Sequence, residues 1–213
     1  EAEATESETG LVLEGSGRGP GGVGRVAIRL EDNDDGNGRL TADWGPVTFK
    51  PGGLQPGQLL GVLGDLTEVA GRMRLLLTFK WSPESGSSSA KVTLTDLSFT
   101  HPQADVKGLD ATVTFDRLAT LSTRSGQQIA ADLVDIGMPL TDVTAKLRIK
   151  PGRQTAYILS EIAFTLAGGR FVIPELAFDP AQERTSATVG INGLDLAQLT
   201  KELDVSEFAM EGK

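Results

Sequence analysis

The sequence predicts an all-β protein made of amphipathic antiparallel strands, and three observations lead to that prediction. Gly (26) and Pro (10) together make up about a sixth of the 213 residues, which favours many short strands separated by turns. Apolar and polar residues alternate at period two in one segment after another. Short turns join most of these segments, so consecutive strands are expected to be antiparallel neighbours.

The alternation is clearest in residues 143–150, where one face of the expected strand is apolar and the other is polar. The apolar positions are Val143, Ala145, Leu147 and Ile149, and the polar positions are Thr144, Lys146, Arg148 and Lys150. We expect further strands at residues 25–30, 39–44, 47–50, 72–81, 91–100, 110–116, 128–136, 157–166, 170–173, 175–179 and 185–191.

Three local features add to this pattern. The apolar phase of residues 91–100 changes by one position between Leu94 and Leu97, which predicts a β-bulge near Asp96. Leucine spacing predicts short helices at residues 56–66 and 194–203. The glycine-rich residues 15–24 are expected to form a loop, or strands whose backbones approach closely.

About ten to thirteen such strands need a partner for their apolar faces. A β-sandwich, a closed barrel and a long sheet curled on itself all provide one, and periodicity does not decide among them. Residues 1–9 are expected to be a disordered lead-in or an artificial remnant. We expect residues 10–213 to form a single elongated segment, less regular over 10–89 and more regular over 90–213.

Composition narrows the classes of function. The formal net charge is −9, and no cluster of Lys or Arg interrupts it, which argues against nucleic-acid binding. Without any cysteine the chain has no disulfide, thiolate metal site or cysteine nucleophile. No apolar run approaches the roughly 18 residues that span a membrane. The start at Glu1, without Met, is expected of a processed chain or of a fragment.

Four motifs suggest a site, and each has a simpler interpretation. Residues 19–24 fit GxGxxG, but a strand follows them, whereas a dinucleotide site needs a helix there. Residues 32–38 resemble a calcium loop but put Ala42 where a bidentate Glu is needed, so a hairpin turn is expected. His101 is the single histidine, which argues against a zinc site, and the absence of a GxSxG motif argues against a serine triad that would use it. We expect a solvated rim of carboxylates at Asp96, Asp105, Asp110, Asp116, Asp132, Asp135 and Asp142.

Five strings between residues 90 and 203 carry a resemblance to a known family through their order and spacing. They are residues 95–99 (TDLSF), 104–115 (ADVKGLDATVTF), 135–142 (DIGMPLTD), 164–170 (FTLAGGR) and 189–197 (VGINGLDLA). With them the chain resembles the YdbH-like family of bacterial envelope proteins, which are related to AsmA-like and TamB-like bridges.

The resemblance implies an all-β fold with a long, curled antiparallel sheet, a β-taco or repeating β-groove. It implies a segment of a bridge that crosses the periplasm of a Gram-negative bacterium and shields phospholipid acyl chains between the inner and outer membranes. The implied partners are a phospholipid or other acyl-chain lipid and a small outer-membrane lipoprotein, with the full-length protein anchored in the inner membrane. The family brings no catalytic motif, so we expect neither enzymatic activity nor a cofactor.

The candidate lipid-facing residues are the apolar positions of the regular strands. They are Val92, Leu94, Ala111, Val113, Phe115, Val143, Leu147, Ile149, Ile162, Phe164, Leu166, Phe171, Ile173, Val189 and Ile191. The same side chains would suit the packed core of a structural or adhesive β-sandwich that binds another protein. A hydrolase would require convergent catalytic groups that the sequence does not reveal.

Overall fold

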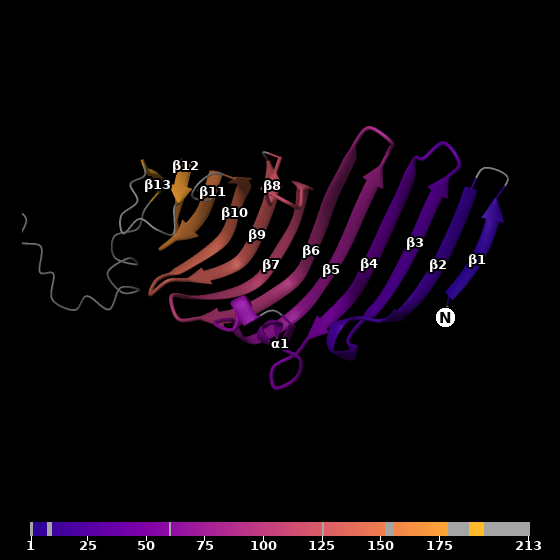
Figure 1. Cartoon of the computed structure of the whole chain (residues 1–213). Coiled ribbons are helices and arrows are strands. Elements are labelled where there is room, and N and C mark those ends of the chain that lie inside the picture. Colours follow the sequence, from indigo (N-terminus) through magenta and orange to yellow (C-terminus); the bar gives the residue numbers. More distant parts are fainter. Residues whose placement is uncertain are drawn as a thin grey trace, which may run out of the picture.

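The structure is a computed structural model that describes residues 2–7, 10–59, 61–124, 126–151, 156–178 and 188–193. These residues form one antiparallel sheet of 13 strands, which confirms the predicted fold class. Twelve strands lie side by side in chain order from β1 to β13, and β8 branches off by pairing with β7 (Figure 1).

The strands in the first half are β1 (Ala2–Ser7), β2 (Gly10–Arg18), β3 (Arg25–Asn33), β4 (Gly38–Phe49), β5 (Thr67–Trp81) and β6 (Gly86–His101). Those in the second half are β7 (Ala104–Arg117), β8 (Ser122–Thr123), β9 (Gln127–Asp135), β10 (Pro139–Lys150), β11 (Ala156–Leu166), β12 (Gly169–Phe178) and β13 (Gly190–Asn192). Short helical turns are η1 (Pro20–Gly22), α1 (Pro56–Leu59) and η2 (Gly61–Leu63).

The sheet is open. In the described residues β1 lies at one end of the strand order and β13 at the other, so the sheet does not close into a barrel. All described strands belong to this one sheet, whereas a sandwich requires two. Of the three architectures that periodicity allows, the long curled sheet is therefore the one observed (Figure 1).

Several local predictions need correction. The lead-in expected at residues 1–9 contains β1, which pairs with β2. The loop expected at residues 15–24 is shorter, because β2 runs to Arg18. The helix expected at residues 56–66 is broken into α1 and η2, in keeping with its two glycines, which are poor helix formers.

Two predicted strand breaks are also wrong, because β4 and β12 each run through their proline. Pro174 lies between the paired positions Ile173 and Glu175 in β12, opposite the irregular position Glu161 in β11. Pro46 lies where the β4–β5 register shifts between Trp44 and Val47, and a proline, which has no N–H for the ladder, is tolerated at such a bulge. The helix expected at residues 194–203 lies outside the described residues, as does most of the strand expected at 185–191.

A row of bulges crosses the sheet, and the one predicted near Asp96 is confirmed. The β5–β6 register shifts on both sides of Ala70, and the β6–β7 register shifts on both sides of Leu97. Residues at such irregularities adopt a positive φ, as the αL position of a bulge requires. They include Glu68, Asp96, Gly108, Asp142 and Glu161.

The polar groups freed at the bulges find partners. The backbone N–H of Asp96 donates to Oδ1 of Asp110 at 3.0 Å, and that of Gly108 donates to Oγ of Ser98 at 3.1 Å. Unpaired backbone groups are costly when they are shielded from water, so these bonds stabilise the irregular row.

Gly71 is required where β5 passes the bulge of β6. Its φ is +121°, and a Cβ atom added there would lie 2.7 Å from Cα of Leu97. Both the backbone conformation and the close approach therefore exclude a side chain.

We predict that Gly71→Val lowers the free energy of unfolding by about 3 kcal/mol or more, since it adds backbone strain to a steric clash. Urea unfolding of the purified chain measures the change. Gly17→Val is the matched control, because a Cβ atom at Gly17 in β2 would meet no heavy atom within 4 Å. Equal stability of the two variants would show that the β5–β6 contact tolerates a side chain.

Candidate functional site

The strand register places apolar side chains of successive strands on one face of the sheet. Residues paired directly across antiparallel strands project to the same face. Val92 pairs with Val113, and Leu94 pairs with Ala111. The series continues from Ala111 to Ile129 and from there to Ala145 in β10. We call this surface the apolar face.

Fourteen of the fifteen candidate residues follow this pattern. In the C-terminal strands Ile162 pairs with Ile173, and Phe164 pairs with Phe171, which in turn pairs with Ile191. Val189 is the exception, because it precedes β13 and has no strand partner. Whether these side chains contact lipid stays a prediction.

The apolar face includes more residues than the fifteen candidates. Val26 of β3 pairs with Trp44, Trp44 with Leu75, and Leu75 with Val92. Leu13 of β2 pairs with Leu30 of β3 and so extends the face further. The signal that finds these residues is the same alternation at 26–30 and 73–79, which the less regular first half of the sequence partly conceals.

Much of the apolar face is only partly buried. Val92, Val113, Phe115 and Leu147 are all intermediate in exposure. Ile28 and Ile191 are 46% and 50% exposed. The described strands provide no second sheet to cover them, and a packed core would leave such residues almost inaccessible.

Two parts of the apolar face are packed more tightly. One surrounds Val47, Phe49, Val69 and Leu97, of which Val47 and Val69 are completely buried. The other contains Leu166 and Phe171, with Met138, Leu140 and Phe164 packed against it. The rings of Phe164 and Phe171 stack with centroids 5.1 Å apart.

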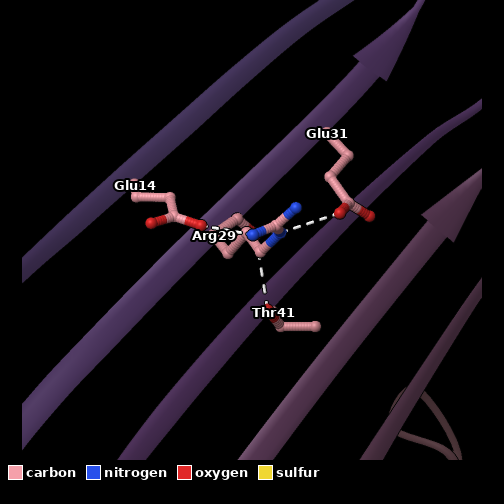
Figure 2. Close-up of polar contacts among 4 residues, drawn as sticks. All are labelled: Glu14, Arg29, Glu31 and Thr41. Atoms are coloured by element: carbon pink, nitrogen blue, oxygen red, sulfur yellow. Dashed lines mark hydrogen bonds and ion pairs between the residues drawn. The ribbon is translucent and has the colours of Figure 1, made fainter. Parts of the chain in front are cut away.

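The opposite face is polar, and several of its charged side chains form ion pairs. Figure 2 shows Arg29 of β3 between Glu14 of β2 and Glu31, with the Thr41 hydroxyl donating to the backbone carbonyl of Arg29. The hydrogen bond to Glu31 and the charges of both carboxylates raise the pKa of Arg29, which stays charged.

Similar pairs continue along this polar face. Arg74 of β5 makes a two-pronged contact with the carboxylate of Asp43 of β4. Those hydrogen bonds and the positive charge lower the pKa of Asp43 against the opposing effect of its partial burial. Further along, Nζ of Lys146 lies 2.5 Å from Oε2 of Glu161.

Two hollows adjoin residues of the polar face. One, of about 620 Å³, is lined by polar residues of β6 to β11, among them Thr93, Thr112, Gln128, Lys146 and Glu161. Four residues of the apolar series also border it, namely Leu94, Ala111, Ile129 and Ala145. A second, of about 530 Å³, adjoins Arg29 and Asp43. The hydroxyl, amide and charged groups in these linings are suited to contact with water.

The structure shows the local conformation at three of the motifs. Residues 19–24 form a loop with η1 and lead into a strand. Residues 34–36 form the β3–β4 turn, where the backbone N–H of Asn37 lowers the pKa of Asp35. Nδ1 of His101 accepts a hydrogen bond from the backbone N–H of Gln103.

Within the described part of the chain, no group of three or more His, Asp or Glu side chains could hold a metal ion. The same residues contain no helix with the length and apolar character needed to cross a membrane.

Comparison with known proteins gives one finding. A family model described as "YdbH-like: Intermembrane phospholipid transport protein YdbH" matches residues 11–213. No curated protein and no solved structure is similar enough to the chain to count as a match.

We predict that Asp43→Asn destabilises the fold slightly at neutral pH and that the difference from the unaltered chain disappears in acid. Because folding lowers the pKa of Asp43 from its ordinary 3.8, its carboxylate stabilises the fold above that pH. The contribution is lost as the pH falls through the lowered pKa. Urea midpoints measured across this pH range test the prediction, with Glu84→Gln in an exposed turn as control. A difference that is the same at every pH would contradict it.

Proposed function

The chain belongs to the YdbH-like family of intermembrane phospholipid transport, and on that premise we propose that it is one segment of a lipid bridge. In this proposal the apolar face holds acyl chains along the sheet, while head groups remain in water. The single observation that carries the proposal is the continuous, partly exposed apolar face that crosses the sheet.

The size of the apolar face supports a lipid as its occupant. At about 4.8 Å between strands, twelve strands extend for roughly 50 Å. Residues 73–79 of β5 alternate apolar positions over a length of about 20 Å at roughly 3.3 Å per residue. One leaflet of a bilayer contributes about 15 Å of hydrocarbon. The face is therefore wide enough for an acyl chain and much longer than one lipid.

The energetics of such binding fit transport. Each CH₂ group that leaves water contributes about 0.8 kcal/mol, so the binding free energy of an acyl chain is the sum of many small contributions. This attraction is non-directional, so a lipid that slides to the next strand exchanges one set of apolar contacts for a similar set. The pairing of Val92 with Val113 and of Ala111 with Ile129 provides such equivalent positions.

The polar face supports the same arrangement. Its ion pairs, such as those of Arg29 and Arg74, keep it hydrated while the opposite side of the same strands holds lipid. The proposal places this segment in the periplasm of a Gram-negative envelope. The inner-membrane anchor and the outer-membrane lipoprotein partner are parts of the proposal that concern the full-length protein. We propose no catalytic role.

The structural or adhesive alternative is weaker because it needs the apolar residues to be packed between two sheets. The described strands form one sheet, and Phe115 and Leu147 stay partly exposed. Mass spectrometry of an organic extract of the purified chain separates the two functions. Bound phospholipid supports transport, and a clean extract supports the alternative.

We predict that Leu147→Asp reduces the phospholipid that co-purifies with the chain several-fold, because it puts a charge onto the apolar face. Phosphorus analysis and mass spectrometry of the extract measure the loss. Phe164→Asp tests a second strand in the same way.

Thr144→Asp is the matched control, since Thr144 lies in the same strand on the polar face and is exposed. It should keep the lipid content of the unaltered chain. Circular dichroism checks that each variant is folded. Leu147→Gln, which adds no charge, is the second variant to use if Leu147→Asp does not fold. Folded Leu147→Asp protein with unchanged lipid would contradict the proposal.

A further inference from the structure

One section of the apolar face is covered by the chain itself. The connection between β4 and β5 leaves the sheet after Phe49 and contains α1 and η2, at the foot of the middle strands in Figure 1. We call residues 51–66, apart from residue 60, which the structure does not describe, the covering segment. Its side chains Leu54, Leu59 and Leu66 pack against the buried cluster that includes Phe49 and Val69.

The covering segment explains why some side chains of the apolar face are much less exposed than others. Val47 and Val69 are completely buried and Leu97 is 7% exposed, although all belong to the same single-layered sheet as the partly exposed Val113. The leucines of the covering segment thus make the contacts that an acyl chain would make elsewhere on the face.

Gln55 anchors the covering segment to the sheet. Its Oε1 accepts a hydrogen bond from the backbone N–H of Val69 at 2.8 Å, and its Nε2 donates to the Val69 carbonyl at 3.3 Å. Nε2 also donates to the carbonyl of Lys50 at 2.9 Å. The last β4–β5 register pair is Phe49 with Gly71, so β4 has turned away before it could pair with Val69. The side-chain amide of Gln55 replaces the missing neighbouring strand.

The covering segment has little regular structure of its own. α1 has four residues and η2 has three. At their ends the backbone N–H groups of Gln58, Gly64 and Leu66 donate to the carbonyls of Gln55, Gly61 and Leu63. Helices of three or four residues depend on tertiary contacts for their stability, so this segment is expected to open more readily than the long strands.

We propose that residues 51–66 are an internal occupant of the apolar face, held by Gln55, which excludes acyl chains from the part formed by β4, β5 and β6 until it is released. Gln55 is a positioning residue in this scheme, and Leu59 is a surrogate for lipid. The inference rests on the proposed function, because it assigns which part of the lipid-binding face is open.

The test uses two phenylalanines on the apolar face. Phe99 of β6 packs against the covered cluster. Phe115 of β7 pairs with Thr123 of β8 and is not part of that cluster. Each is replaced, one at a time, by photoreactive p-benzoylphenylalanine in the 213-residue chain. The probe is tritiated dioctanoyl phosphatidylethanolamine, whose zwitterionic head avoids repulsion by the acidic chain. We expect strong labelling at position 115 and weak labelling at position 99.

Release variants then test the cover. Gln55→Ala removes the anchor, and Leu59→Ser weakens the apolar contact. Either should raise labelling at position 99 several-fold and leave position 115 unchanged. Leu121→Ser is the matched control, because Leu121 lies in a turn, is 55% exposed and is not part of the covered cluster.

The outcomes separate the two proposals. Equal labelling of positions 99 and 115 in the unaltered chain overturns the cover alone. Folded release variants without added labelling at position 99 also overturn it. No labelling at either position in any variant overturns the lipid-binding function and the cover together. If both release variants fail to fold, hydrogen exchange of the unaltered chain decides, since the cover requires the amides of Gly64 and Leu66 to exchange much faster than those of β6.

Discussion

The structure depends on keeping one side of every strand apolar across a sheet that also bends. An extra residue in one strand changes which of the later positions point to the apolar face, so the apolar phase of the sequence must change at the same place, as it does between Leu94 and Leu97. Here the bulges come in neighbouring pairs. The extra residue at Glu68 in β5 is followed by one at Asp96 in β6, and the register beyond them returns to its former alignment. The apolar face therefore continues through the irregular row.

An open sheet with a continuous apolar face is an unusual solution for a protein surrounded by water. Soluble monomers rarely expose a contiguous apolar patch larger than a few hundred Å². This chain covers one part itself, around Val47 and Val69, and leaves Phe115 and Leu147 partly exposed. In the proposed function acyl chains cover the exposed part, which would link the fold to membership of a lipid-transport family. The ion pairs on the polar face, including Arg74 with Asp43, keep the other side hydrated.

The agreement between sequence and structure differs from element to element. The strands at 91–100, 110–116 and 143–150 and the bulge at Asp96 follow from alternation and its one-residue phase change. The misplaced breaks lie at Pro46 and Pro174, where local propensity favours an end to the strand. Pro46 lies at a bulge within β4, where the ladder needs no proline N–H, and the β4 segment alone does not show this.

By itself the sequence determined that the protein is all-β, that its strands have one apolar side and that the chain is acidic, because these follow from composition and period-two alternation. Fourteen of the fifteen candidate side chains share a face for the same reason. Only the tertiary structure decided that the sheet stays open and that residues 51–66 cover part of it. Alternation states which side of a strand is apolar, but what packs on that side depends on contacts between residues far apart in the chain, such as Gln55 with Val69.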